Sequence, residues 1–263
     1  MANRHTLLKL TLFVVLIFAP LVLASCTGPA ASEKKVLRIG TEGAFPPFNY
    51  IDENNQLVGF EIDFGRAVAE RMGYEAEFTT GEFGGLLTSL LANKFDVIIA
   101  SMTILPERQE KANFSDWYYV DGDTIVVSKD NTTINSEQDL AGKVVGATTG
   151  TTQETAAKAL DEKYGLAEIK LYPSDVEGMQ DLGSGRIDAF IGAQIQMAFR
   201  IAENNEPIRI VGGLLNESFK GAAFRKEDTQ LLEEFNKAFA EMIKDGSYKQ
   251  LSEKWFGIYI GPE

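Results

Sequence analysis

The feature that most constrains the fold is an alternation of strands and helices that occurs twice along the chain. Short apolar runs predict strands at 36–40, 76–79, 95–101, 143–147, 169–172 and 187–191. Amphipathic segments predict helices between them at 59–72, 86–92, 151–160 and 176–182. Because this alternation produces parallel sheet with helices on its faces, the sequence predicts an α/β protein built from two βαβαβ lobes.

The last helices predict how the two lobes are joined. An amphipathic helix from Leu231 to Ile243 and a short helix that carries Trp255 need a sheet to cover, and the first lobe has room for them. If the chain returns to that lobe, two segments connect the lobes, near 121–126 and 218–224. We therefore predict lobe 1 at 36–122 and 219–263, lobe 2 at 123–218, a two-segment hinge, and a ligand site in the cleft between the lobes.

The first residues predict a targeting segment. Arg4 and Lys9 flank an apolar run at 10–23, and small residues lead into the only cysteine, Cys26. This pattern resembles a bacterial lipoprotein signal, with a signal peptide at 1–25, lipid on Cys26 and a flexible tether at 26–35. The alternative is a short membrane anchor. Pro20 and an apolar core of roughly 14 residues, short of the ~20 that a spanning helix needs, argue against it. The expected location is extracytoplasmic and lipid-anchored to the membrane.

Composition excludes several kinds of chemistry. Without Arg4 and Lys9, 23 basic residues face 38 acidic ones, a net charge of −15, which disfavours binding to nucleic acid. The one histidine, His5, lies in the predicted signal, and Cys26 is the only thiol. The mature chain therefore has no Ser-His-Asp or Cys-His unit, no usual zinc site and no internal disulfide, and we expect no metal or cofactor.

The clearest local pattern for a ligand site follows the predicted strand at 95–101. Ser101, Met102 and Thr103 come at its end, and Arg108 follows a proline turn. Ligands of open α/β sheets bind beyond the carboxyl ends of strands, and a guanidinium can hold both oxygens of a carboxylate. The plain alternative is a surface ion pair between Arg108 and Glu107 or Glu110.

A second pattern joins a strand to a helix at 146–154. Thr151 and Glu154 fit a capping box, and a helix start attracts an anion. Ser174 and Glu177 have the same spacing before another helix, so the capping box alone is weak evidence for binding. Its position matters more, because this turn and the one with Arg108 are expected to face the cleft from opposite lobes.

Aromatic and acidic residues complete the candidate site. Phe45 and Phe83 follow strand ends, where a ring could pack on the carbon skeleton of a ligand or belong to the core, whereas Phe48 is interpreted as a core residue. Glu42 and Glu82 lie close by in sequence, and either could recognise a cationic group or be solvated.

Together these residues resemble the family 3 extracellular solute-binding proteins, the polar amino-acid receptors of ATP-binding-cassette importers. The resemblance spans residues 36–256. It rests on Arg38-Ile39-Gly40-Thr41, Phe45-Pro46-Pro47-Phe48, Gly59-Phe60-Glu61-Ile62-Asp63, Ser101-Met102-Thr103-Ile104 with Glu107-Arg108, Phe114-Ser115-Asp116, Gly150-Thr151-Thr152-Gln153 and Gly185-Arg186-Ile187-Asp188-Ala189. It implies a two-lobed periplasmic-binding-protein fold that closes on a small ligand and passes it to a membrane permease, without catalysis and as a monomer.

The resemblance also implies roles for individual residues. Arg108 would clamp a ligand carboxylate with help from Ser101, Thr103 and Thr152. The second lobe would contribute Thr148, Thr151 and Gln153. Phe45 and Phe83 would enclose the ligand, and Glu42 matches a position that contacts cationic side chains in basic amino-acid receptors.

One position departs from the family pattern. Where the family places an aspartate that takes the α-ammonium of the ligand, this sequence has Ala193 followed by Gln194. Three explanations remain open: the ligand lacks a free primary α-ammonium, Gln194 or a cleft glutamate compensates, or the alignment is shifted here. An ammonium buried without its counter-ion is penalised by several kcal/mol.

Two other functions on the same scaffold are weighed against transport. One is an enzyme, because the chain also resembles cyclohexadienyl dehydratase, whose chemistry needs a general acid such as Glu42 or Glu82. The other is a sensor that presents its closed form to a membrane kinase. A lipid anchor fits capture beside a permease better than metabolism.

Overall fold

The computed structural model describes residues 35–203 and 205–262. From Lys34 onward the chain is one compact unit. The predicted signal peptide and Cys26 lie outside the described residues. Within the described ranges, no helix has the length and apolar character needed to cross a membrane.

Lobe 1 is built on a five-stranded sheet in the order β5-β1-β6-β15-β7. Its strands are β1 (Lys35–Thr41), β5 (Tyr74–Thr80), β6 (Val97–Ile98), β7 (Ala112–Phe114) and β15 (Ala223–Arg225). β1 pairs in parallel with β5 and β6, and β15 runs antiparallel to β6 and β7. Its helices are α1 (Phe60–Arg71), α2 (Phe83–Leu91), α3 (Pro106–Gln109), α7 (Thr229–Lys244) and α8 (Ser247–Phe256). A small antiparallel sheet is formed by β2 (Ala44–Phe45), β3 (Asn49–Ile51) and β4 (Leu57–Val58).

Lobe 2 repeats this plan in the order β11-β10-β12-β9-β13. Its strands are β9 (Asp123–Ser128), β10 (Val144–Thr148), β11 (Glu168–Tyr172), β12 (Ala189–Ala193) and β13 (Ile208–Val211). Its helices are α4 (Thr152–Tyr164), α5 (Asp175–Gly183) and α6 (Gln194–Glu203), with a 3-10 turn at Glu137–Leu140. In each sheet three parallel strands are followed by an antiparallel fourth, so the predicted α/β class with two similar lobes is confirmed.

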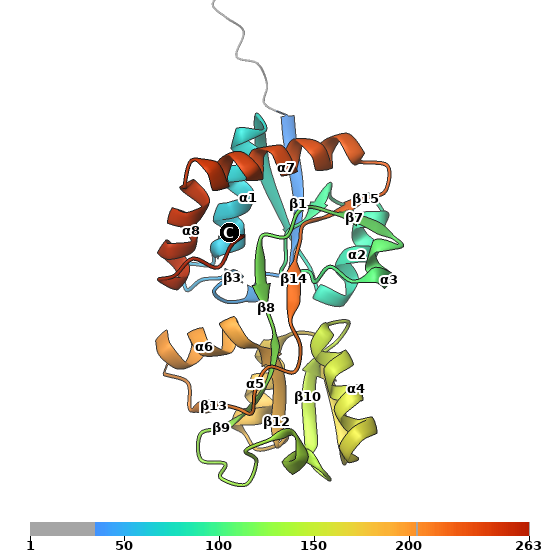
Figure 1. The fold of residues 1–263 in the computed structure, drawn as a ribbon, viewed down its shortest axis with the longest axis vertical. Coiled ribbons are helices and arrows are strands. Elements are labelled where there is room, and N and C mark those ends of the chain that lie inside the picture. The colour runs from blue at the N-terminus through green and yellow to red at the C-terminus, as the bar shows by residue number, and fades with distance from the viewer. Residues whose placement is uncertain (1–34, 204, 263) are drawn as a thin grey trace, which may run out of the picture. The chain divides into compact units, whose positions relative to one another are not determined.

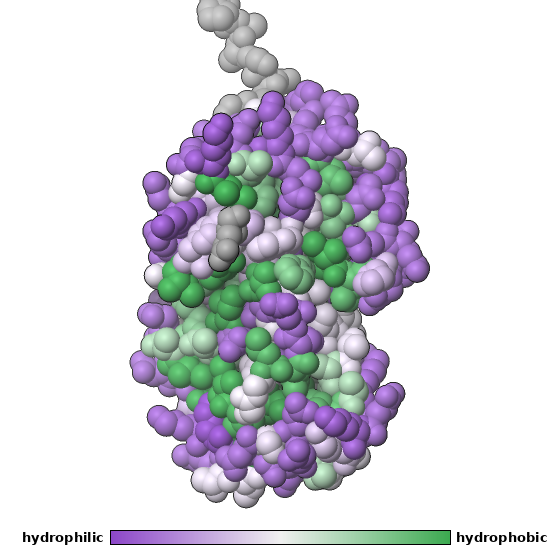
Figure 2. All heavy atoms as spheres, viewed as in Figure 1, coloured by the Kyte–Doolittle hydropathy of each residue, from purple (hydrophilic) through white to green (hydrophobic). Residues whose placement is uncertain are grey.

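Two strands connect the lobes. β8 (Tyr119–Asp121) leads into β9, β14 (Ser218–Lys220) leads into β15, and the two pair antiparallel. Figure 1 shows them side by side between the upper and lower sheets. Figure 2, in the same view, shows polar residues at the two outer ends of the molecule and apolar residues across its middle. The two-segment hinge is thus confirmed, whereas the residue bounds of the lobes stay a prediction.

An aromatic core holds the helices of lobe 1 on their sheet. Phe48, Phe60 and Phe64 are fully buried. The Phe48 ring stacks on Tyr119 at a centroid distance of 4.8 Å, and Phe60 and Phe64 pack against Tyr248 at 5.8 and 5.6 Å. Rings of this kind bury large apolar areas and prefer edge-to-face contacts. Phe48 is therefore a core residue, and α7 and α8 return to lobe 1 as predicted, where both contact α1.

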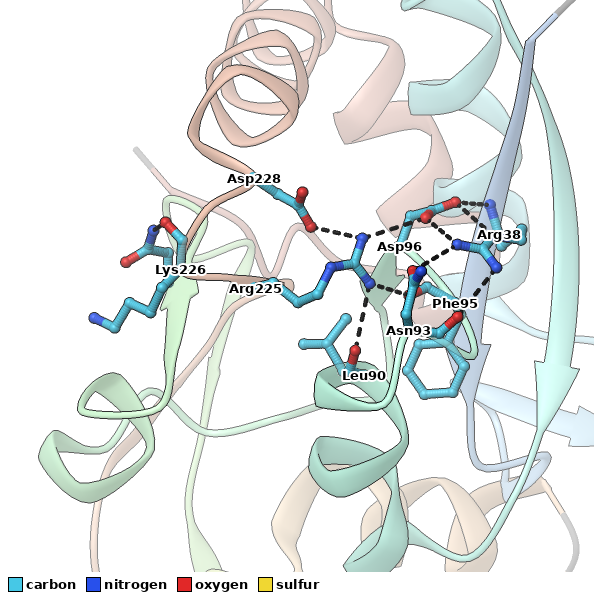
Figure 3. A network of polar contacts seen from close by, with 9 residues as sticks. Arg38, Leu90, Asn93, Phe95, Asp96, Arg225, Lys226 and Asp228 are labelled. Atoms are coloured by element: carbon cyan, nitrogen blue, oxygen red, sulfur yellow. Dashed lines mark hydrogen bonds and ion pairs between the residues drawn. The ribbon is translucent and has the colours of Figure 1, made fainter.

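A polar network ties the returning strand to the first strand (Figure 3). The Asp96 carboxylate accepts hydrogen bonds from Arg38 at 2.6 and 3.0 Å and lies 3.4 Å from Arg225 on β15. Arg225 also donates to the Phe95 carbonyl at 2.5 Å and pairs with Asp228 at 2.6 Å. Because the Arg225 side chain is largely buried, these contacts fix β15 against β6.

The predicted strand at 95–101 is shorter in the structure. β6 covers only Val97–Ile98, and Ser101 has a positive φ of 53°. The Ser101 N–H turns away from the sheet to donate to the buried Glu61 carboxylate at 2.5 Å. The strand therefore ends early because the Ser101 N–H bonds to a carboxylate of the core and not to a neighbouring strand.

Candidate functional site

All predicted ligand-binding residues except Met102 and Gln194 line one pocket between the two lobes. The empty space within this pocket, open solvent at its mouth included, is about 410 Å³, and the centre of a water-sized sphere can reach about 30 Å³ of it. The lining consists of Glu42, Phe45, Phe83, Ala100, Ser101, Thr103, Arg108, Thr148, Thr151, Thr152, Gln153, Asp175, Ala193 and Lys220. That these residues contact a ligand stays a prediction.

A buried carboxylate, that of Glu61, holds Ser101 in position. Glu61, near the start of α1, accepts from the Ser101 hydroxyl at 3.0 Å and from the Tyr118 hydroxyl at 2.5 Å. Asn49 donates to its second oxygen at 2.6 Å. Burial raises the pKa of Glu61, and these hydrogen bonds act in the opposite direction. The Ser101 turn is thus held by the core of lobe 1, not by the ligand.

Arg108 extends from lobe 1 across the pocket toward lobe 2. Its guanidinium donates to the Thr103 carbonyl and to the Gly150 carbonyl, each at 2.9 Å, and lies 5.5 Å from the centre of the Phe83 ring. Among the described residues it forms no ion pair within 4 Å, so the expected alternative of a pair with Glu107 or Glu110 is absent there. Burial lowers the pKa of Arg108, although a guanidinium remains charged.

The start of α4 faces Arg108 from the other lobe. Thr151 caps the helix by accepting from the Glu154 N–H at 3.3 Å, which is one half of the predicted capping box. The Glu154 carboxylate accepts from the Gly150 N–H at 2.7 Å and not from that of Thr151, so the reciprocal half does not form. The N–H groups of Thr152 and Gln153 have no acceptor within the described part of the chain. Free N–H groups at a helix start, opposite a guanidinium, form a site for an anion.

The side chains of Thr152 and Gln153 are already engaged. Both donate to the same oxygen of Asp123, Thr152 at 3.1 Å, and Asn216 donates to the other oxygen at 2.6 Å. Asp123 itself does not line the pocket. Thr152 and Gln153 therefore offer a ligand their backbone N–H groups more directly than their side-chain donors.

Two acidic residues lie together at another part of the lining. Burial and the charge of Asp175 raise the pKa of Glu42 to about 8. Asp175, the first residue of α5, is buried and accepts a hydrogen bond from the Thr148 hydroxyl. Burial also raises the pKa of Asp175, and the charge of Arg200 partly opposes the effect. Glu42 has no hydrogen bond or ion pair to another described residue.

Sequence reasoning missed Lys220, Asp175 and Ala100 as lining residues. Lys220 is the last residue of β14 and only 4% exposed, and its ammonium donates to the Thr103 hydroxyl at 2.8 Å. Asp175 follows the N-cap Ser174, where an acidic residue is usual in any helix. The one available signal for Lys220 was a lysine inside an apolar hinge segment.

Met102, Gln194 and Glu82 lie elsewhere. Met102 is buried in an apolar cluster with Leu86 and Leu90, and Gln194 has an exposed side chain at the start of α6. Glu82 is exposed and precedes α2. Ala193 does line the pocket, at the end of β12, and is 3% exposed.

The lobes touch through backbone beside this pocket. A Cβ built on Gly150, whose φ is +76°, would lie 3.1 Å from the Gly84 Cα, and one on Gly84 would lie 3.4 Å from the Thr149 carbonyl oxygen. Side chains are therefore missing on both sides where the lobes approach each other. In the described part of the chain, no group of acidic, histidine or cysteine side chains could hold a metal ion.

Two similar α/β lobes, two connecting strands and an interlobe pocket are the features of a two-lobed, hinged receptor for a small solute. The chain matches the bacterial extracellular solute-binding proteins, family 3, over residues 37–258. It belongs to this family.

Named relatives agree with this assignment. The L-cystine-binding protein TcyJ of Escherichia coli (strain K12) is 36% identical over 229 residues, which cover 87% of this chain and 85% of the relative. The arginine-binding extracellular protein ArtP of Bacillus subtilis (strain 168) is 35% identical over 242 residues, 91% of this chain and 93% of that one.

Solved structures support the same fold. An ancestral arginine-binding protein bound to arginine superposes with a TM-score of 0.79 at 42% identity, covering 85% of this chain and 99% of that one. An ancestral amino acid-binding protein, a precursor of cyclohexadienyl dehydratase, gives 0.78 at 36% identity over 84% and 95%. The neighbour related to the dehydratase is thus itself a binding protein.

Proposed function

We propose that this protein is a lipid-anchored receptor of an ATP-binding-cassette importer that captures a small carboxylate, an amino acid or amino-acid derivative. The observation that carries the proposal is the half-buried Arg108 guanidinium, which has no carboxylate partner among the described residues and faces the free N–H groups of Thr152 and Gln153. These donors come from opposite lobes, so a carboxylate between them stabilises the closed arrangement. Cystine and arginine, which the named relatives bind, both carry such a group.

The proposal includes delivery and location. Closure around β8 and β14 would give a membrane permease a loaded form to recognise, and lipid on Cys26 would keep the receptor at the outer face of the membrane. Lobe 1 at 36–122 and 219–263 would then move against lobe 2 at 123–218. The matched relatives are binding proteins, which favours transport over catalysis.

Calorimetry tests the proposal. We expect at least one of a panel of amino acids, their derivatives and organic acids to bind with a dissociation constant near the micromolar range, about −8.2 kcal/mol. Arg108→Ala should remove this binding, whereas Arg186→Ala, which changes an exposed arginine paired with Asp181, should not. Absence of heat with every carboxylate, for a folded protein, argues against the proposal.

One observation favours a second candidate, a dehydratase-like enzyme. With a pKa of about 8, Glu42 is protonated at neutral pH and could serve as a general acid in the pocket. Phenylpyruvate formation from prephenate measures this activity directly. Turnover that disappears in Glu42→Gln would reverse the order of the two proposals.

A further inference from the structure

Two cationic side chains converge on Thr103 at one end of the pocket. Arg108 donates to the Thr103 carbonyl at 2.9 Å, and Lys220 donates to the Thr103 hydroxyl oxygen at 2.8 Å. Because that oxygen accepts from Lys220, its own proton is left for an acceptor in the pocket. Every charged pocket-lining group at this end is therefore a donor.

The other end offers acceptors. Glu42 and Asp175 line this end. The Thr148 hydroxyl donates its proton to Asp175, so the Thr148 oxygen can only accept a hydrogen bond from a ligand. The charges that act on Glu42 come from Asp175, Glu61 and Glu177 and are all negative. No described cation balances Glu42, so this end is complementary to a cationic group of a ligand, whose charge would lower the pKa of Glu42 and favour its ionised form.

The strand order keeps the two ends apart. In lobe 1, Glu42 follows β1 and Lys220 precedes β15, with β6 between these strands. In lobe 2, Asp175 follows β11 and Ala193 ends β12, with β10 between them. Because α5 contacts β2, the two carboxylates meet on the same side of the cleft, and Lys220 lies on the hinge side.

An α-ammonium would be poorly accommodated at the cationic end. The carboxylates nearest to Lys220 are Asp121 and Asp123, and neither lines the pocket. Asp121 accepts from the Gly122 and Ile195 N–H groups and its charge acts on Lys220, while Asp123 is occupied by Thr152, Gln153 and Asn216. A ligand carboxylate on Arg108 would place an α-ammonium beside the like charge of Lys220, with Ala193 in the lining.

We propose that the pocket recognises an ω-amino or ω-guanidino carboxylate without an α-ammonium, and that Lys220 determines this specificity. The inference rests on the proposed function, since it assumes a ligand carboxylate at Arg108. Such a ligand has its negative group at one end and its positive group at the other, as the pocket requires. Lys220 supplies, as part of the protein, the positive charge that an α-amino acid would bring as its own α-ammonium.

Matched ligand pairs test the proposal on the unchanged protein by calorimetry. The pairs are 6-aminohexanoate with lysine, 5-aminopentanoate with ornithine, and 5-guanidinopentanoate with arginine, which differ only in the α-ammonium. We expect the partner without the α-ammonium to bind at least tenfold more tightly, a difference of about 1.4 kcal/mol. Equal or tighter binding of the α-amino partners overturns the inference and leaves the proposed function standing.

Two further outcomes distinguish a failure of this inference from a failure of the proposed function. If other carboxylates bind but none of the ω-cationic ones does, the inference fails alone. If no carboxylate of any kind binds to the folded protein, the proposed function fails with it.

Two variants and one control variant show which residues produce the preference. Lys220→Met should reduce the preference within each pair at least tenfold, whereas Lys226→Met, at an exposed lysine nearby, should preserve it. Glu42→Gln should weaken 6-aminohexanoate at least tenfold but not hexanoate, which lacks the cation. An unchanged preference in folded Lys220→Met refutes the role of Lys220, and if that variant does not fold, the matched pairs on the unchanged protein decide.

Discussion

The raised pKa of Glu42 predicts a stability that falls with pH. The folded protein keeps the Glu42 proton up to about pH 8, while the unfolded chain releases it near 4.5. Between these values the unfolded state binds fewer protons, so stability decreases as pH rises, by about 1.4 kcal/mol per pH unit. From pH 5 to pH 7 the loss from this one group is about 3 kcal/mol. The substitution Glu42→Gln removes this pH dependence, because glutamine is neutral at every pH.

Urea unfolding followed by tryptophan fluorescence measures the effect at pH 5, 6, 7 and 8. We expect Glu42→Gln and the unchanged protein to differ little at pH 5 and to diverge as pH rises, with the variant more stable. Asp175→Asn should flatten the slope of the unchanged protein, because the Asp175 charge is one cause of the shift. The exposed Glu82→Gln controls for loss of a carboxylate. Parallel stability curves for the protein and Glu42→Gln would refute the reasoning.

Four other predictions concern binding, the core and the anchor. Arg108→Ala should weaken carboxylate binding by about 2–5 kcal/mol in calorimetry, and unchanged affinity would mean that the ligand lies elsewhere. Ala193→Asp should tighten binding of ordinary α-amino acids only together with Lys220→Met, because Lys220 would otherwise pair with the new carboxylate; a gain from the single change contradicts this. Arg225→Met should lower stability by about 3 kcal/mol in urea unfolding, since it leaves Asp96 and Asp228 without a shared partner, and an effect below about 1 kcal/mol would show that the network is dispensable. Cys26→Ser should move the protein from the detergent phase to the aqueous phase in phase partitioning, and an unchanged distribution would exclude lipid on Cys26.

The sequence predicted the fold because its two halves carry the same order of strands and helices. The pocket-lining residues at strand ends could also be found, since Thr148 and Ala193 end buried strands and Thr103 follows one, and the carboxyl ends of these strands meet at the cleft. Arg108 was found because its proline turn follows such a strand. These residues share a local sequence pattern that can be recognised without a structure.

Lys220 and Asp175 carry no such signal. A lysine in a connecting segment is exposed in most proteins, and only the pairing of β14 with β8 and the bridge to Thr103 bury this one. Asp175 looks like an ordinary acidic residue in the first turn of a helix. The raised pKa of Glu42 could not be predicted from the sequence either, because the groups that act on it, Asp175, Glu61 and Glu177, come from distant parts of the chain. Sequence order cannot reveal electrostatics that arise from tertiary contacts.

The backbone contact between Gly84 and Gly150 sets how far the two lobes can travel toward each other. With hydrogen as the only side chain on both sides, the end of that travel is fixed by the main chain, and a single methyl group inserted there would act as a wedge. Because the Gly150 carbonyl also accepts a hydrogen bond from Arg108, such a wedge would displace the guanidinium that the proposed ligand needs. The closest approach of the lobes and the position of Arg108 are therefore set at the same place in the backbone.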